Sequence, residues 1–89
     1  MTCELRLRGA LRQQAAGTPA HTVGGSTVAE AVGALEREHP GVAGWILDER
    51  GALRRHINLY VNGEPAELGT AVADGDTIDV LPAISGGRR

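Results

Sequence analysis

Hydrophobic and polar residues alternate at the beginning of the chain. Cys3, Leu5 and Leu7 are separated by charged residues, a pattern typical of a strand with one buried face. Residues 13–20 are small and polar, and they predict a loop. Residues 21–23 predict a short returning strand. The chain is therefore expected to open with a hairpin.

The clearest local prediction is a helix that follows this hairpin. Thr27 and Glu30 have the spacing of a capping box, in which the threonine accepts from a first-turn amide and the glutamate reaches back to the cap amide. Pro40 disfavours helical geometry in the residue before it, so we expect a helix at 28–38. The residues spaced for its apolar face are Val28, Ala31, Val32 and Leu35.

A second hairpin is predicted in the second half of the chain. The apolar residues at 42–47 are expected to form a single helical turn that closes the end of the core. Residues 57–61 alternate and stop at Asn62-Gly63, a strong hairpin signal. The return strand, at 64–68, should be a short edge strand because Pro65 cannot donate to the ladder.

The last predicted strand leads into a thin tail. An Asp-Gly-Asp turn at 74–76 precedes alternating residues at 77–81, and Pro82 ends the ladder. The element order predicts an α+β fold of the β-grasp type, with a mixed sheet of four to five strands and one main helix across it. Its first and last strands should be central parallel neighbours. We expect a β-grasp domain at 1–82 and a flexible tail at 83–89.

Composition and charge narrow the classes of function. A chain of 89 residues with a net charge of −2 indicates one domain without the basic face that nucleic acids require. The charged N-terminal residues do not resemble a signal peptide, and no segment reaches transmembrane length. We expect a cytoplasmic protein with no nucleic-acid or membrane partner. Cys3, the only cysteine, cannot form an intramolecular disulfide and is expected to be buried.

No catalytic or metal-binding constellation is predicted. His21, His39 and His56 lack ligand spacing with one another or with Cys3, and are expected to be solvent-facing loop residues. The chain also lacks a phosphate-binding Gly-rich loop with its lysine. The basic group at 54–56 either steers an acidic partner or is simply solvated surface. We therefore expect a protein that is not an enzyme and binds no cofactor or metal.

Several segments together resemble the ubiquitin-like sulfur carriers of the ThiS/MoaD family. They are Ile-Asn-Leu-Tyr-Val-Asn-Gly at 57–63, Ala-Asp-Gly-Asp at 73–76, and Val-Leu-Pro-Ala at 80–83 running into Gly-Gly at 86–87. No single segment is specific to this family, but the combination of the segments at these spacings is. The resemblance extends over 5–87 and is greatest to the actinobacterial, CysO-type branch, which supplies sulfur for cysteine and some secondary metabolites.

The resemblance implies chemistry at Gly87. In this family a ubiquitin-activating-type enzyme uses ATP to adenylate the terminal glycine, a sulfur donor displaces AMP, and the thiocarboxylate passes sulfide to a biosynthetic enzyme. Gly86 and Ser85 would thread the tail into these partners, because small residues pass a narrow channel. Here Arg88 and Arg89 follow the glycine. We expect a peptidase, of the zinc-dependent isopeptidase kind, to remove both.

The docking surface is expected beside the tail. Alternation places Leu81 on the strand face opposite the core, and Leu59 or Tyr60 on the strand expected nearby. With Ile84 in the tail, these residues could form an apolar patch for an activating enzyme. The alternative is that Leu59 belongs to the core and Leu81 is an isolated surface aliphatic.

Three other functions remain open. The first is a protein modifier joined through Gly87 to lysines of target proteins, although the chain has no lysine to accept a copy of itself. The second is a small subunit whose tail inserts permanently into its partner, as in molybdopterin synthase. The third is an interaction module that does not use its tail. Cysteine, thiamine, molybdopterin and a thiosugar or other sulfur-containing secondary metabolite all fit as the product, since the fold does not choose among them.

Overall fold

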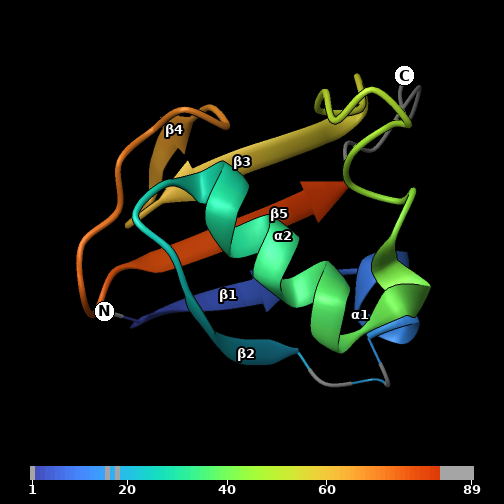
Figure 1. Ribbon diagram of the computed structural model, residues 1–89, viewed down its shortest axis with the longest axis horizontal. Coiled ribbons are helices and arrows are strands. Elements are labelled where there is room, and N and C mark those ends of the chain that lie inside the picture. The colour runs from blue at the N-terminus through green and yellow to red at the C-terminus, as the bar shows by residue number, and fades with distance from the viewer. Residues whose placement is uncertain (1, 16, 18, 83–89) are drawn as a thin grey trace.

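In the computed structural model, which describes residues 2–15, 17 and 19–82, five strands form one sheet and a helix crosses one of its faces (Figure 1). The elements are, in chain order, β1 (Thr2–Leu7), α1 (Ala10–Gln14), β2 (Ala20–Gly24), α2 (Val28–Glu38), the 3-10 helix η1 (Pro40–Val42), β3 (Ile57–Val61), β4 (Glu64–Ala66) and β5 (Thr77–Pro82). The strand order is β2-β1-β5-β3-β4, with β1 and β5 parallel at the centre and the other pairs antiparallel. The predicted α+β, β-grasp fold is confirmed.

The core lies between the sheet and α2. Alternate residues of the central strands face the helix and are almost completely buried, as the period of two requires. On the helix side, the four residues predicted for the apolar face are all buried. The core residues without measurable exposure are Leu5, Ala15, Val28, Ala31, Val32, Leu35, Val42, Ile46, Ile78 and Val80.

The start of α2 is held by two side chains, one of which has a different partner from the one expected. The Thr27 hydroxyl accepts a hydrogen bond from the Glu30 amide at 3.2 Å, as predicted. The Glu30 carboxylate instead accepts from the Ser26 amide at 2.8 Å and from the Ser26 hydroxyl at 3.0 Å. It thus reaches one residue beyond the cap. These bonds, the amide first, lower the pKa of Glu30 below its ordinary value.

Replacing Thr27 with alanine is expected to lower the free energy of unfolding by about 1 kcal/mol, because the Glu30 amide loses its acceptor at the helix start. Urea unfolding followed by circular dichroism measures this difference. Thr22→Ala, at an exposed position of β2, is the matched control. An equal loss in the two variants would show that the cap contributes nothing specific.

The segment after β1 differs from the prediction. The predicted loop at 13–20 begins inside α1, which carries the chain from β1 toward β2. Leu11 and Ala15 are both buried, and their spacing of four residues is the helical signal that the prediction overlooked. Gly9 has a φ of 61°, a conformation that favours glycine, and it turns the chain from the strand into this helix.

The apolar group at 42–47 closes one end of the core only in part. The helical turn there is η1, which begins earlier, at Pro40. Val42 and Ile46 are buried as expected, but Trp45 has 42% of its surface exposed. The indole is therefore on the surface of the protein rather than in the core.

The hairpin and the last turn are joined by side chains. Asn62 and Gly63 both have positive φ, as the predicted turn between β3 and β4 requires. The Asn62 side chain donates to Asp76 at 3.0 Å and accepts from the Thr77 amide at 3.0 Å. Asp76 also accepts from the Ala73 amide at 2.8 Å. The backbone hydrogen bond, and then the one from Asn62, lower the pKa of Asp76.

Asp76→Asn is expected to weaken the dependence of stability on acid pH. Since the folded-state pKa of Asp76 lies below its unfolded value, its ionised form contributes stability above about pH 4, and that contribution is lost as pH falls through the lower, folded-state pKa. Urea midpoints measured from neutral pH downward should therefore fall less steeply in the variant. Glu64→Gln, at an exposed position, is the control. An unchanged slope for Asp76→Asn would contradict the assignment.

Candidate functional site

The end of the sheet at which β5 finishes is where the tail sequence begins. Because β1 and β5 are parallel, they finish at the same end, with Leu7 paired to Val80 (Figure 1). On the other side of β5, Pro82 pairs with Ile57, the first residue of β3. Gly9 is packed so closely here that a Cβ on it would lie 3.2 Å from Cγ of Pro82. Residues 83–89 thus continue from a position bordered by β1 and β3.

The residues expected to carry the chemistry and the processing lie outside the described residues. This holds for the docking residue in the tail and for the residues of the threading, activation and cleavage sites. Their assignments stay predictions. They are Ile84, Ser85, Gly86, Gly87, Arg88 and Arg89.

The sheet face away from α2 carries two of the predicted docking residues. Leu81 and Tyr60 are both partly exposed, and they alternate with the buried residues of their strands. Leu81 lies opposite Asn58 and Tyr60 lies opposite Asp79, so the two docking residues are diagonal neighbours across β3 and β5. They share one face next to the tail end of the sheet.

Leu59 does not belong to this patch. Only 3% of its surface is exposed, and it packs in the core with the residues beneath α2. The expectation that it contributes to docking is wrong, because in β3 the alternation places Ile57 and Leu59 on the core face and Tyr60 on the other.

Asp79 gives this open face an acceptor. Its side chain is 19% exposed, and Arg8, the nearest cation that forms an ion pair with it, is 3.8 Å away, from Nη2 to Oδ1. Within the part of the chain that the structure describes, Oδ1 is buried and has no hydrogen-bond partner. A buried acceptor of this kind is normally satisfied, and the contact that compensates it is the ion pair with Arg8.

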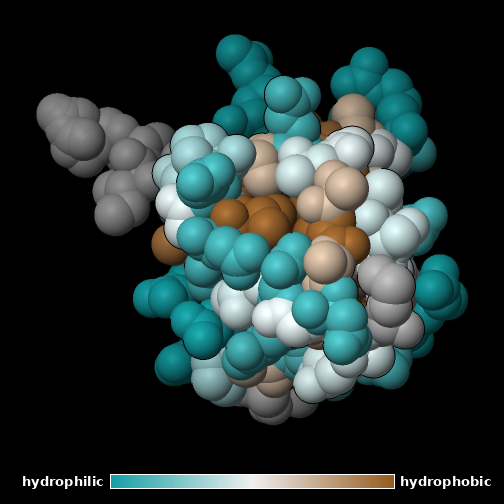
Figure 2. Space-filling view, turned by 90° about the vertical axis from the view of Figure 1, so that its left-hand side faces the viewer, coloured by the Kyte–Doolittle hydropathy of each residue, from teal (hydrophilic) through white to brown (hydrophobic). Residues whose placement is uncertain are grey.

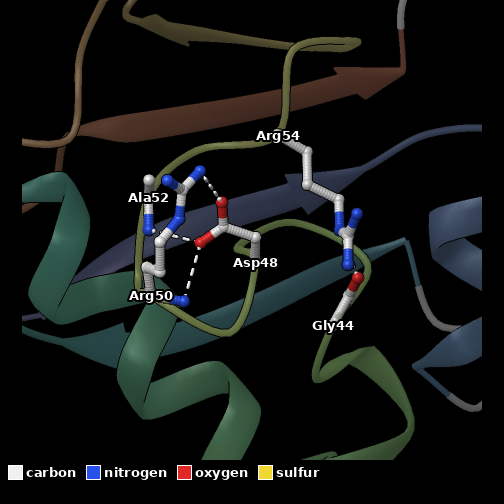
Figure 3. A network of polar contacts seen from close by, with 5 residues as sticks. All are labelled: Gly44, Asp48, Arg50, Ala52 and Arg54. Atoms are coloured by element: carbon white, nitrogen blue, oxygen red, sulfur yellow. Dashed lines mark hydrogen bonds and ion pairs between the residues drawn. The ribbon is translucent and has the colours of Figure 1, made fainter.

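A second surface at the same end is the loop between η1 and β3, residues 43–56. Asp48 holds this loop by accepting from the amides of Arg50, at 2.9 Å, and Ala52, at 3.0 Å, while the Arg50 guanidinium donates to it at 3.0 Å (Figure 3). These bonds, that of Ala52 first, lower the pKa of Asp48. Nε of Arg54 donates to the Gly44 carbonyl and joins the two limbs of the loop.

Among the described residues, the cysteine is a poor nucleophile and the histidines form no metal-binding group. Cys3 is buried, and burial, with a smaller effect of Asp76, raises the pKa of its thiol, which makes it a poor nucleophile. The expectation that His21 is a solvent-facing loop residue is wrong. It lies in β2 with only 9% exposure, and the centre of its ring is 4.7 Å from that of the His39 ring, in an edge-to-face arrangement. Among the described residues, no three potential ligands are grouped for a metal ion.

No helix in the described part of the chain has the length and apolar character needed to cross a membrane.

Comparison with known families matches residues 6–87 to the ThiS family. The chain belongs to the ThiS family. Its likeness to this family covers the end of β1, the other four strands, both α-helices and the sequence up to the second glycine of the tail.

Two similar proteins have different named roles. The sulfur carrier protein CysO of Mycobacterium tuberculosis is 35% identical over an alignment of 83 positions, which covers 86% of this chain and 89% of CysO. Small archaeal modifier protein 1 of Haloferax volcanii is 42% identical over 64 residues, 72% of this chain and 74% of the modifier. This ThiS-family chain is thus a ubiquitin-like protein of the sulfur-carrier type, related to both carriers and modifiers.

The CysO chain of the Amycolatopsis orientalis BexX/CysO complex has the same fold. This solved structure superposes with a TM-score of 0.85 and 34% identity, covering 96% of this chain and 99% of that one. In that case, a protein similar to this ThiS-family chain is bound to a partner protein.

Sequence reasoning missed how two of these features are assembled. The basic group at 54–56 was noted, but not its position one residue from the strand that pairs with Pro82. Nor was Arg8 recognised as the ion-pair partner of Asp79. The signal for Arg8 was the parallel pairing of β1 with β5, which brings the ends of these two strands together.

Proposed function

We propose that this protein is a sulfur carrier that is not itself an enzyme, and that it works through a thiocarboxylate formed at Gly87. The observation that carries the proposal is that the match to the ThiS family runs through Gly87 itself. The similarity to CysO over 86% of the chain supports it. The topology supports it too, because the central strand β5 is the last strand of the sheet and the diglycine follows it a few residues later in the sequence.

The chemistry requires a partner that supplies activation. A carboxylate is a poor electrophile, so its oxygen attacks the α-phosphate of ATP, pyrophosphate leaves, and an acyl adenylate forms. Hydrosulfide then attacks the acyl carbon and AMP leaves, which gives the thiocarboxylate and releases a proton. Gly86 and Gly87 suit this step, since a backbone without side chains can enter a narrow active site in extended form. Because ATP is consumed, we place this cycle in the cytoplasm.

Processing must come first. The Gly87 carboxyl is held in a peptide bond to Arg88, and an amide cannot be adenylated in its place. A peptidase, of the zinc-dependent isopeptidase kind, would hydrolyse that bond and release Arg88-Arg89. The mature carrier would then end on the glycine that reacts.

Docking is proposed on the open face of the sheet. Leu81 and Tyr60 would contact the activating enzyme there, with Ile84 continuing the contact into the tail. Ser85 would pass into the channel together with the glycines.

The sulfur acceptor is proposed to be a biosynthetic enzyme that makes cysteine, thiamine, molybdopterin or a sulfur-containing secondary metabolite. One observation favours a second function, conjugation of Gly87 to lysines of other proteins. It is the 42% identity to small archaeal modifier protein 1. Both functions need the same activated Gly87. They differ only in the nucleophile that attacks it, which is sulfur for the carrier and a lysine amine for the modifier.

The test is to load the purified chain in vitro. Chains ending at Gly87 and at Arg89 are each incubated with the adenylating enzyme of the same organism, ATP and a sulfide source, and their intact masses are measured. The proposal expects one oxygen to be replaced by sulfur in the shorter chain only. Loading of neither chain, with an enzyme shown to make acyl adenylate on another carrier, would overturn the proposal. Adding cell extract then distinguishes free thiocarboxylate from covalent adducts, which would favour the modifier.

A further inference from the structure

The net charge of −2 conceals a separation of charge along the sheet. At the end where β1 and β5 begin, the last turn and the first residue of the edge strand β4 are acidic: Glu64, Asp74 and Asp76. Figure 2 views this end, where hydrophilic residues lie below and beside a small apolar group and residues of intermediate hydropathy lie above it. At the other end, where β5 finishes, arginines lie on both sides of Pro82. Opposite charges at its two ends give the protein an electric dipole, which orients it in the field of a charged partner.

The first group of arginines lies at the end of β1 and in the segment that follows it. Arg6, Arg8 and Arg12 line a recess of about 310 Å³ together with Gly9, the residue packed against Pro82. Arg12 is exposed, and 56% of the Arg8 side chain is exposed even though it faces Asp79. These side chains can therefore reach a molecule that approaches from the end of the sheet.

The second group precedes β3. Arg54 and His56 line a recess of about 290 Å³ with Gly44 and Trp45, and Arg55 lines an adjoining one. His56 directly precedes Ile57, the partner of Pro82, so this group borders β5 on the side opposite Arg8. Arg54 is fixed in place by the hydrogen bond that its Nε donates to the Gly44 carbonyl.

The acidic residues of the same loop offset only part of this charge. Asp48 is paired with Arg50 at 3.0 Å. Glu49 lines a recess with Glu36 of α2 and Arg54, whereas Arg55 and His56 line an adjoining one with Asp48. Because Asp48 is already paired with Arg50, Arg55 keeps its charge on the side of the loop next to β3.

We propose that these residues form a docking collar, defined as Arg8, Arg12, Arg54 and Arg55 with Trp45, for an acidic protein surface. This inference rests on the proposed function: the acidic surface would surround the mouth of the channel in the activating enzyme that receives the tail. Arginine forks bind carboxylates in pairs, and tryptophan and arginine are the residue types that contribute most at interface centres. The acidic far end would be repelled by the same surface, so the carrier arrives with its tail end first.

The collar is distinct in chemistry from the patch of Leu81 and Tyr60. That patch offers apolar contact, which salt does not screen, whereas charged groups on an exposed rim act mainly on the rate of association and are screened by salt. The collar therefore predicts a salt-dependent rate, and the apolar patch does not.

The test measures pyrophosphate exchange by the activating enzyme of the same organism, with the chain ending at Gly87 as substrate. Arg12→Glu and Arg55→Glu each change the charge of one side of the collar. Arg37→Glu, at an exposed position of α2 that lines neither recess, changes the net charge equally and is the control. At low salt the collar variants should lose about threefold to tenfold in kcat/KM, with kcat unchanged, and the loss should shrink at high salt.

Trp45 provides a second readout, because it is the only tryptophan of the chain. With an activating enzyme whose own tryptophans have been replaced, its fluorescence should change on binding. Trp45→Ala should raise KM in both low and high salt.

The outcomes separate this inference from the proposed function. Exchange with the unmodified chain, but equal kcat/KM for Arg12→Glu, Arg55→Glu and Arg37→Glu, would overturn the collar alone. No exchange with any chain ending at Gly87 would overturn the proposed function and the collar with it. If the collar variants kept their rates but lost binding to a DNA duplex, or lost a low-salt dimer seen by sedimentation, the occupant would be a nucleic acid or a second copy, and the proposal would be wrong.

Discussion

Ile78→Ala is expected to lower the free energy of unfolding by about 2–5 kcal/mol, the usual range for removing a large aliphatic side chain from a core. Ile78 has no measurable exposure. It lies at the centre of the sheet, where β5 pairs it with Leu5 on one side and Val61 on the other. Neighbours held on both sides cannot collapse easily into the space, so a cavity remains. For a chain of this size, such a loss is a large fraction of the total stability.

Urea unfolding monitored by circular dichroism measures this effect. Thr22→Ala, on the exposed face of the edge strand β2, should stay within about 0.5 kcal/mol of the parent chain. A loss below about 1 kcal/mol for Ile78→Ala would mean that the centre of the sheet is not packed as described.

Gly87→Ala, in a chain that ends at this residue, is expected to lower kcat/KM for thiocarboxylate formation roughly a hundredfold, since a small displacement of the reacting carboxylate costs about that much. A Cβ at the reacting residue would meet the walls of a channel that fits glycine. The measurement is the initial rate of sulfur incorporation by intact mass, with the activating enzyme, ATP and a sulfide source.

The stability of Gly87→Ala should equal that of the parent chain, which separates loss of chemistry from loss of folding. Glu38→Gln, at an exposed position of α2, is the control for the rate and should load normally. Loading of Gly87→Ala within twofold of the parent would contradict the carrier mechanism and favour an interaction module that does not use its tail.

Much of the fold could be predicted because its signals are local. The alternation in β1, β3 and β5 identified their buried faces, and the cap at Thr27 and the proline at position 40 set the bounds of α2. The central parallel pairing of β1 and β5 followed from the element order. Such patterns depend on the period of each element and on turn chemistry, which a sequence displays directly.

The predictions that proved wrong concern residues whose local signal is weak or whose position depends on contacts between elements. α1 is only five residues long, so Leu11 within it and Ala15 just after it make too short a pattern to separate from a polar loop. The polarity of His21 predicts a solvent-facing loop residue, but its place in the alternation of β2 decides its position, and it is buried. Leu59 could not be placed until the register of β3 showed which face meets α2.

The candidate site was predictable in its chemistry but not in its surroundings. The diglycine and the arginines after it are visible in the sequence. The gathering of Arg8 and Arg54 on either side of Pro82 depends on the contacts of Pro82 with Ile57 and with Gly9, which are 25 and 73 positions away in the chain, and no local pattern carries information about such contacts.

The most direct test of the sulfur-carrier account is the intact mass of the protein recovered from its own cells. The account predicts a species that ends at Gly87, accompanied by one in which a carboxylate oxygen is replaced by sulfur. Recovery of the protein only with Arg88 and Arg89 still attached, and without any sulfur-containing form, would contradict it.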